Sequence, residues 1–398
     1  MQTVHDSPTK IEFASWPSFG AEEIEAVAAV LASGRVNYWT GELGKSFEEQ
    51  FAAFVGTEHA MTISNGTVAL EIALKALGVG VGDEVIVTSR SFMASASSIA
   101  WLGATPVFAD VDLGSGNITR QTVEPLVTER TKAIIAVHLA GWPCEIAPIL
   151  DLAKGAGLKV IEDCAQAHGA RYRGQSVGSL GDIGTWSFCQ DKIISTGGEG
   201  GMLTMNDEAL WAACWSIRDH GKSYDAVHRA DHPVGYRWLH QSFGTNARLT
   251  EMQSALGIFG LRILPETLRL RTRNAQRLGA ALSNIPAVRL ETPGPELTHA
   301  YYRYYAYVRP ELLKRGWDRD RLIEQITARG VPCASGSCSE LYRESAFLQA
   351  GIGPVNRLPN AQALGETSLA FFVHPNLSER AIERTGEVVA EVFHLATP

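Results

Sequence analysis

The feature that most limits the fold of this chain is a regular alternation of helix-like and strand-like segments between residues 20 and 205. Segments with apolar residues at helical spacing are separated by short apolar runs of strand length. This alternation is typical of a mainly parallel sheet sandwiched by helices. We expect helices at residues 22–31, 45–54, 68–77 and 146–156, and strands at 59–63, 84–87, 105–108, 133–137 and 158–162.

The pattern changes after residue 192. A glycine-rich hinge at 197–201 leads to a short strand at 202–204, and a long, mostly helical region follows at 250–284. The remainder mixes a tyrosine-rich strand at 301–308 with helices at 319–329 and 378–394. With 398 residues, the chain is too long for one core of ordinary size. We predict an α/β domain at 1–255 and a bridging helix with a smaller α+β domain at 256–398.

Composition excludes several classes of protein. The chain is 45% hydrophobic and 20% charged, as in an ordinary globular enzyme. Its net charge of -8 and the absence of a long basic run argue against a nucleic-acid partner. The sequence contains no run of about 18 apolar residues, so we expect no membrane span. The first residues do not resemble a secretory signal. Six cysteines without a CxxC pair predict a reduced, cytoplasmic protein with no metal site.

Lys192 gives the strongest chemical signal. It precedes a glycine-rich loop in the sequence SFCQDKIISTGGEGG, residues 187–201. A lysine between a strand and such a loop can reach into a cleft, where partial burial leaves a nucleophilic amine suited to Schiff-base chemistry. A surface lysine before a turn would give the same local pattern. The interpretation therefore depends on the residues that accompany Lys192.

Asp163 ends the apolar segment at 159–162. Open α/β sheets place their ligands at the carboxyl ends of their strands. A carboxylate there can keep the pyridine nitrogen of pyridoxal phosphate (PLP) protonated, which makes the ring an electron sink. A helix cap explains a single acid equally well. Glu162 points to the opposite side of the strand and is the weaker candidate.

The turn Ser64-Asn65-Gly66-Thr67 precedes the predicted helix at 68–77. A small, glycine-containing turn at a helix amino terminus presents free N–H groups and a positive dipole end, which suit a phosphate. The same turn is also common as plain structure. In combination, an anion-binding turn, a strand-end acid and a loop lysine supply three parts of one PLP site.

An ordered series of motifs carries a resemblance to a known family. The sequence closely resembles the DegT/DnrJ/EryC1/StrS sugar aminotransferases, which have the aspartate aminotransferase fold (type I) with a seven-stranded PLP-binding sheet. The resemblance runs from about residue 19 to 250, and more loosely to 375. Its motifs are the turn at 64–67, GDEVIV (82–87), SFMAS (91–95), GATPVFADVD (103–112), VHLAGWP (137–143), VIEDCAQAHGA (160–170), GDIGTWSF (181–188), Lys192 and GGEGG (197–201).

The resemblance implies a role for each cofactor residue. Lys192 would form the Schiff base with PLP and, once displaced by substrate, would move the proton between the substrate and the cofactor. Asp163 would pair with the pyridine nitrogen, and Gln166 would contact the O3′ oxygen. The other expected contacts are Asn65, Gly66, Thr67 and Ser187 around the phosphate and Phe92 stacked on the ring.

The resemblance also implies a homodimer with shared active sites. Asn246, in the segment GTNARLT (244–250), would reach the phosphate of the cofactor in the neighbouring subunit. Arg248 would support that loop or contact substrate, although a structural ion pair explains it equally well. A branch of the family with histidine at the lysine position performs dehydration, so Lys192 favours amination.

Two segments depart from the commonest family pattern, namely 189–191 and 330–342. Both are expected beside the substrate site, and Tyr342 in the second is a candidate substrate residue. His168 and His220 are further candidates, although a structural histidine is the more common role. The implied reaction is transfer of an amino group, with glutamate as the usual donor, to a nucleotide-linked keto-deoxy sugar. A keto-cyclitol or other polyhydroxylated ketone, or a regulator that binds PLP without turnover, are the alternatives.

Overall fold

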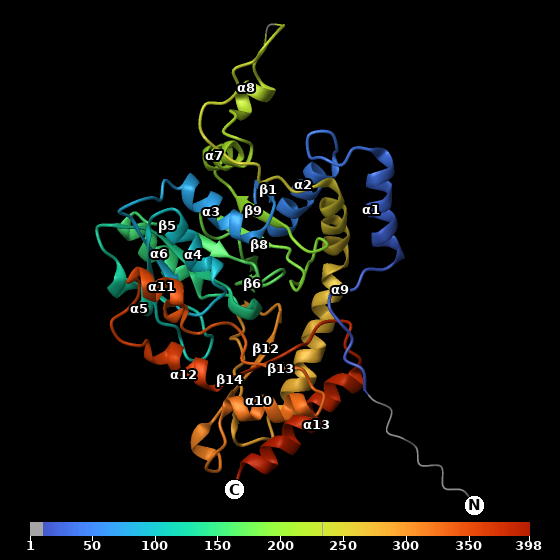
Figure 1. Ribbon diagram of the computed structural model, residues 1–398, viewed down its shortest axis with the longest axis vertical. Coiled ribbons are helices and arrows are strands. Elements are labelled where there is room, and N and C mark those ends of the chain that lie inside the picture. The colour runs from blue at the N-terminus through green and yellow to red at the C-terminus, as the bar shows by residue number, and fades with distance from the viewer. Residues whose placement is uncertain (1–10, 233) are drawn as a thin grey trace, which may run out of the picture.

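The computed structural model describes residues 11–232 and 234–398 (Figure 1). A seven-stranded sheet forms its centre, in the order β1-β9-β8-β5-β4-β2-β3. The antiparallel pairs are those that β9 makes with β1 and β8, and the other neighbours are parallel. The predicted α/β class with a mainly parallel sheet is confirmed. The strands are β1 (His59–Ile63), β2 (Glu84–Thr88), β3 (Thr105–Ala109), β4 (Thr131–Val137), β5 (Lys159–Asp163), β8 (Ile183–Ser187) and β9 (Gly201–Met205).

Helices cover both faces of this sheet (Figure 1). Val85 and Val87 of β2 pack into one apolar cluster, whereas Ile86 between them belongs to another. Burial on both faces explains why the strands read as continuous apolar runs. The main flanking helices are α1 (Ala21–Ser33), α2 (Leu43–Val55), α3 (Gly66–Ala76), α4 (Ala94–Trp101), α6 (Ile146–Ala156) and α7 (Glu208–Arg218).

The long helix α9 (Glu251–Leu282) connects the large sheet region to the lower part of the molecule (Figure 1). Thr250 and Gln253 begin it with a capping box, as helix starts favour. Its first half approaches α2 so closely that a Cβ on Gly257 would lie 2.4 Å from the ring of Phe47. Its second half buries Leu278 and neighbouring residues in the smaller core.

The smaller core surrounds a four-stranded sheet in the order β10-β12-β14-β13. Its strands are β10 (Val288–Arg289), β12 (Tyr304–Val308), β13 (Cys333–Ala334) and β14 (Ser368–Phe371), flanked by α10 (Arg319–Ala328) and α13 (Glu379–Ala396). The predicted strand at 301–308 begins at Tyr304, because Tyr301 has a positive φ of 50° that an extended strand does not allow.

One segment of the predicted second domain packs on the large sheet instead. Leu341 and Phe347 join the apolar cluster of β2, and the carboxylate of Asp110 accepts the N–H groups of Asn360 and Ala361 at 3.0 and 2.9 Å. This segment contains α11 (Ser345–Ala350) and α12 (Pro359–Thr367). The division at residue 255 falls inside α9 and remains a prediction.

Residues 222–232 and 234–245 form an arm that stands away from the body and contains α8 (Tyr224–His228) (Figure 1). Among the described residues, no helix is long and apolar enough to cross a membrane. The remaining short elements are α5 (Arg120–Val123), β6 (Arg171–Tyr172), β7 (Gln175–Ser176), β11 (Leu297–Thr298), and the 3-10 turns η1 (Glu124–Leu126), η2 (Leu139–Gly141), η3 (Pro310–Leu312) and η4 (Leu341–Arg343).

Candidate active site

Lys192 lies in the loop that follows β8, with only 14% of its side chain exposed. Its ammonium group lies 4.9 Å from the centre of the Tyr302 ring and 3.7 Å from Oδ1 of Asp191. Its backbone carbonyl accepts a 2.8 Å hydrogen bond from the indole N–H of Trp16. Residues distant in the sequence therefore hold this lysine between the two parts of the molecule.

Asp163 is buried at the carboxyl end of β5, 5% exposed. Its Oδ2 accepts a 2.8 Å hydrogen bond from the Ser95 hydroxyl, and its Oδ1 accepts one of 3.1 Å from the Ala165 N–H. Burial raises the pKa of Asp163, while these hydrogen bonds and the charge of Lys192 act in the opposite direction. A cation beside this carboxylate would be stabilised, and a protonated pyridine ring is such a cation.

Ser95 is a site residue that the sequence analysis missed. Its hydroxyl lies between Asp163 and the hydroxyl of Ser91, 2.8 Å from each. Ser95 lies in the first turn of α4, whereas Ser91 precedes the helix and pairs with Cys338 in an isolated β-bridge. The two serines in SFMAS were the available signal.

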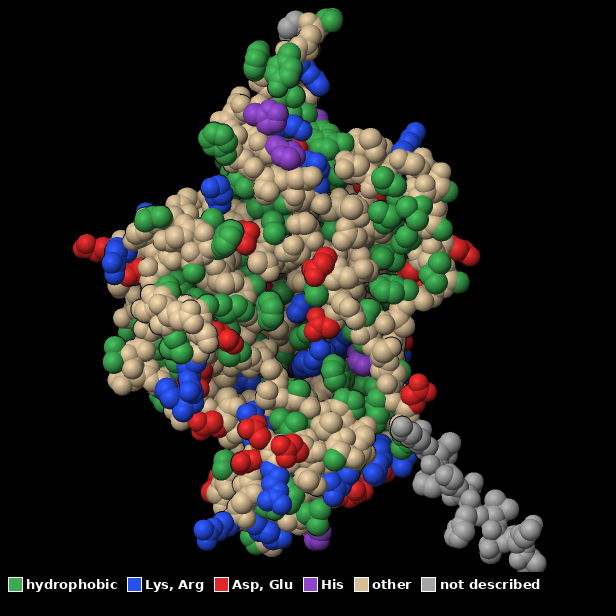
Figure 2. Space-filling view, in the orientation of Figure 1, with side chains coloured by type: hydrophobic (Ala, Val, Ile, Leu, Met, Phe, Trp, Pro, Cys, Tyr) green, Lys and Arg blue, Asp and Glu red, His purple; other side chains and the backbone are tan. Residues whose placement is uncertain are grey.

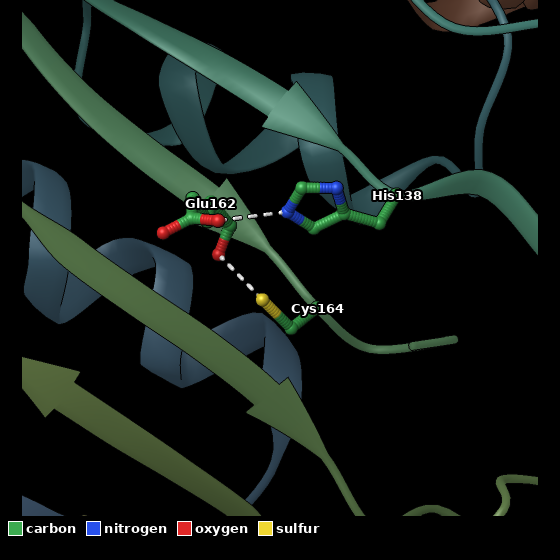
Figure 3. A group of neighbouring side chains, drawn as sticks. All are labelled: His138, Glu162 and Cys164. Atoms are coloured by element: carbon green, nitrogen blue, oxygen red, sulfur yellow. Dashed lines mark hydrogen bonds and ion pairs between the residues drawn. The ribbon is translucent and has the colours of Figure 1, made fainter. Parts of the chain in front are cut away.

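Glu162, whose side chain alternates with that of Asp163 along β5, makes a separate buried network with His138 (Figure 3). Its Oε1 accepts the N–H groups of Leu180 and Gly181 at 2.8 and 2.7 Å, and its Oε2 lies 3.0 Å from Nε2 of His138. The Cys144 N–H donates to Nδ1 of His138, so Nε2 carries the proton and donates to Glu162. Hydrogen bonds lower the pKa of Glu162 against the opposing effect of burial. This network fixes the ends of β4 and β5.

The thiol of Cys164 completes the group drawn in Figure 3. His138, Glu162 and Cys164 are residue types that can bind a metal, and they lie close together. The thiol, however, points to the carbonyl oxygen of Glu162 at 3.7 Å, and both imidazole nitrogens of His138 already have partners. Their interactions are therefore those of a structural network.

The predicted anion-binding turn begins α3. The Asn65 side chain accepts the N–H of Val68 at 3.0 Å and so caps the helix. The N–H groups of Gly66 and Thr67 lie in the first turn, where a helix offers no backbone partner. A Cβ on Gly66 would lie 2.7 Å from Cβ of Ser187. The turn and the end of β8 thus form one small cradle that suits a phosphate.

Gln166 and Phe92 also lie at this end of the sheet. The Gln166 side-chain oxygen accepts the N–H of Ala140 at 2.7 Å, which leaves its amide nitrogen as the donor for a ligand. Phe92 follows β2 and is 68% exposed, an unusual state for a large aromatic ring. Both placements fit contacts with a planar cofactor.

The segment around Asn246 lies at the base of the arm. Asn246 is exposed, and its backbone forms an isolated antiparallel β-bridge with the backbone of Asp219. Nη1 of Arg248 lies 3.0 Å from the Asp219 carboxylate, as does Nζ of Lys222. Arg248 therefore has the structural ion pair considered from the sequence, and its contact with substrate remains a prediction. His220 is exposed nearby with a positive φ of 61°.

The two other candidate substrate residues, His168 and Tyr342, are both buried. His168 is fully buried between the rings of Trp186 and Phe188, with centroids 5.4 and 5.5 Å away, which fits the structural role that is more common for a histidine. Tyr342 is 4% exposed and packs on Phe108. Its hydroxyl accepts the N–H of Leu358 and donates to Glu340, which gives it a structural role.

A cavity of about 250 Å³ extends beside the lysine loop. The N-terminal segment at 13–16 closes one side, and residues of the smaller core form the other. Asp191, Arg303 and His374 contribute its polar groups. In Figure 2, basic and acidic side chains are visible inside a hollow between the upper and lower parts of the molecule.

The comparisons with known proteins agree with this geometry. The DegT/DnrJ/EryC1/StrS aminotransferase family matches residues 17–391. The X-ray structure of an aminotransferase from Psychrobacter cryohalolentis is 52% identical, with a TM-score of 0.95 over 96% of this chain and 99% of that one. A GDP-perosamine synthase from Caulobacter vibrioides is 41% identical over 370 residues, 89% of this chain and 92% of the relative. A proposed L-glutamine:3-amino-2,3-dideoxy-scyllo-inosose aminotransferase from Streptoalloteichus tenebrarius is 34% identical over 350 residues, 86% of this chain and 81% of the relative.

The fold, with a loop lysine and a buried strand-end carboxylate at one edge of a mainly parallel sheet, defines a PLP-dependent aminotransferase. The chain belongs to the DegT/DnrJ/EryC1/StrS aminotransferase family. PLP is the cofactor of this family, and the cradle at Gly66 and the buried carboxylate of Asp163 fit its phosphate and its ring nitrogen.

Gly66→Ala should weaken PLP binding, because the new methyl group would lie 2.7 Å from Cβ of Ser187 and would fill the cradle. Titration of the apoprotein with PLP, followed by absorbance, measures the effect. Gly155→Ala in α6 is the control, since its Cβ would meet open space and should leave PLP affinity unchanged. Equal PLP affinity in Gly66→Ala and the wild type would contradict the assignment of the cradle.

His168 makes stability depend on pH. Burial, with smaller contributions from Lys192 and Arg271, lowers its pKa to about 3 from an ordinary value of 6.5. The unfolded chain therefore binds one more proton between these values, so stability is lost as the pH falls through this window. His168→Phe should remove a slope of about 1.4 kcal/mol per pH unit from the free energy of unfolding.

Urea unfolding at several pH values between 4 and 7 measures this slope. The wild-type protein, measured in parallel at each pH, is the reference. A His168→Phe variant with the wild-type slope would show that His168 is not the neutral buried group that we describe.

Proposed function

We propose that this aminotransferase moves an amino group from glutamate to a nucleotide-linked keto-deoxy sugar in two alternating half-reactions. The chemical part of the proposal rests on two residues. Lys192 contacts Asp191 and Tyr302, and Asp163 is buried nearby with a pKa on which the charge of Lys192 acts. The sugar part is supported by the GDP-perosamine synthase from Caulobacter vibrioides, which is similar over most of this chain.

Lys192 and Asp163 have complementary roles in this proposal. Lys192 holds the cofactor and, once a substrate amine displaces it, its free Nζ moves the proton between the substrate carbon and C4′ of the cofactor. Asp163 keeps the pyridine nitrogen protonated, and Ser95 orients this carboxylate by its 2.8 Å hydrogen bond. Bound PLP supplies the electron sink for the carbanion that deprotonation creates.

The remaining cofactor residues position the ring. Gly66, Thr67 and Ser187 bind the phosphate through the cradle, and Asn65 supports them by capping α3. Two further side chains complete the contacts, since Gln166 donates to the O3′ oxygen and the exposed ring of Phe92 stacks on the pyridine.

A keto-cyclitol is the second candidate acceptor, because the Streptoalloteichus relative is named for a scyllo-inosose substrate.

The cytoplasmic location expected from the sequence remains a prediction. A PLP-binding regulator without turnover is the weaker alternative, since the lysine, the acid and the phosphate cradle are all present.

We further propose that two copies of this chain share their active sites. The arm at 222–232 and 234–245 exposes large apolar side chains, as Figure 2 shows near its tip, and Val234, Trp238 and Phe243 are each at least 86% exposed. Such exposure is unfavourable in water unless another surface covers it. Asn246 at the base of this arm is exposed and is the residue that would reach the partner's cofactor phosphate.

Glutamate should bleach the visible absorbance of the PLP-loaded wild type, and a nucleotide-linked 4-keto-6-deoxy sugar should restore it. Lys192→Ala should lose at least about 100-fold of the turnover, because the amine that moves the proton is removed. Stopped-flow absorbance measures both half-reactions. The exposed Lys75, changed to alanine, is the control. Indifference of the wild-type spectrum to every amino donor would refute transamination, and restoration by keto-cyclitols alone would select the second candidate.

Mixed oligomers test the shared sites. Lys192→Ala disables the site of its own subunit, whereas Asn246→Asp places a negative charge beside the phosphate of its neighbour. Random mixing of the two variants should restore about a quarter of the wild-type activity, since half of the dimers would contain one intact site. Activity assays after co-refolding or co-expression measure it. Activity no higher than the mean of the separate variants would mean that each subunit builds its site alone.

A further inference from the structure

The N-terminal segment, residues 11–18, is fastened to the smaller core before the chain enters α1. The ring of Phe13 packs against the apolar cluster of this core. The side-chain amide of Asn376 donates to the carbonyl oxygen of Ser15 at 2.8 Å and to the hydroxyl of Ser18 at 2.9 Å. Figure 1 shows the segment beside the lower part of α9. Its path is therefore set by the smaller core and not by the large sheet.

Trp16 is the residue of this segment that contacts the lysine loop. Its indole N–H donates to the backbone carbonyl of Lys192 at 2.8 Å. The guanidinium carbon of Arg271 lies 5.0 Å from the centre of the indole ring, and the His374 ring stacks on it with centroids 5.9 Å apart. Arg271 is fully buried, and a cation–π contact is strongest where water is excluded. The ring is thus fixed on its faces, with its N–H directed at the loop.

The backbone of Lys192 has few other restraints. The residue lies in a bend outside any helix or strand, and the glycine-rich hinge that follows permits many backbone conformations. Its own N–H donates to the carbonyl of Cys189 at 3.1 Å, a bond within the same loop. Among the described residues, Trp16 is the one hydrogen-bond donor to its carbonyl oxygen. The orientation of the lysine therefore depends on a contact from outside the loop.

The same buried arginine also orders the amine end of the lysine. Nη1 of Arg271 donates to the carbonyl oxygens of Tyr301 and Tyr302 at 3.2 and 3.4 Å. The ring of Tyr302 in turn lies 4.9 Å from Nζ of Lys192. Trp16 thus holds the backbone of the lysine and Tyr302 contacts its amine, while Arg271 contacts both of these aromatic residues. The two ends of one side chain are fixed from a common point on α9.

We propose that Trp16 is a positioning residue for transamination, whose hydrogen bond fixes the backbone of Lys192 so that Nζ stands within reach of the proton it moves. A side chain that transfers a proton must lie within hydrogen-bond reach of it. A displacement of about 1 Å can cost about 100-fold in rate. Because the N-terminal segment is fastened to the smaller core, Trp16 also makes the placement of this amine depend on that core. The inference rests on the proposed role of Lys192 and is independent of which ketone accepts the amino group.

Trp16→Phe is the sharpest variant, because it keeps a ring over Arg271 and removes only the N–H. The rate of bleaching at saturating glutamate should fall about 10-fold, as the loss of one positioning hydrogen bond predicts. The half-saturating glutamate concentration should change less than about twofold, since no substrate contact is removed. Stopped-flow absorbance over a range of glutamate concentrations separates the two quantities. Trp101→Phe is the matched control, since Trp101 is 79% exposed on α4, and it should behave as the wild type.

Hydrogen exchange in the apoprotein gives a readout that needs neither cofactor nor turnover. Amides of the peptide 188–196 should exchange about 2- to 10-fold faster in Trp16→Phe, because the loop opens more easily without the bond. Amides of β5 should exchange as in the wild type, which separates a local effect from general destabilisation. Asn376→Ala should accelerate the same loop peptide less, since it releases Ser15 and Ser18 but leaves the indole N–H in place.

Three results would overturn the inference. Weaker glutamate saturation with an unchanged maximal rate would mean that Trp16 only lines the cavity. Unchanged exchange of the loop peptide would mean that the bond does not hold the loop, and faster exchange in β5 as well would mean that the whole protein is destabilised. If no amino donor bleaches the wild-type cofactor, the proposed function fails instead, and the exchange measurement alone decides whether Trp16 fixes the loop.

Discussion

A buried carboxylate at the carboxyl end of the central strand β5 is the constraint around which this site is organised. Asp163 has few partners for a charge removed from water, namely the Ser95 hydroxyl and the Ala165 N–H, and burial raises its pKa. The unfavourable energy of this arrangement is relieved when a cationic ring lies against it. Glu162, the next residue back along β5, is buried as deeply but is fully hydrogen-bonded and has a lowered pKa. Adjacent acids on opposite faces of one strand thus have different roles, one fixing the strand ends and the other facing the cofactor.

The second organising feature is the charge around the lysine loop. Asp191 lies between Lys192 and Arg303, while Arg271 is buried behind them under the Trp16 ring. The half-exposed carboxylate of Asp191 therefore balances part of the positive charge beside the reacting amine.

Much of the fold and the cofactor residues could be predicted from local sequence. The alternation of segments located the strands, and the strand-end position of Asp163 together with the glycine loop after Lys192 marked the catalytic edge of the sheet. The contacts of Arg303 with Asp191 could not be predicted, since they join segments more than a hundred residues apart that meet only through the smaller domain. The burial of Tyr342 and His168 could not be predicted for a related reason: it depends on Phe108 and Trp186, which the local pattern does not reveal.

The central claim is that Lys192 carries the cofactor, and chemical trapping tests it most directly. Borohydride reduction of the PLP-loaded protein fixes the cofactor permanently to the lysine that carries it, and proteolysis with mass spectrometry then identifies that residue. Our account predicts that the pyridoxyl mass appears on the peptide containing Lys192 and on no other lysine in stoichiometric amount. Stoichiometric label on a different lysine, or none in a protein that binds PLP, would contradict it.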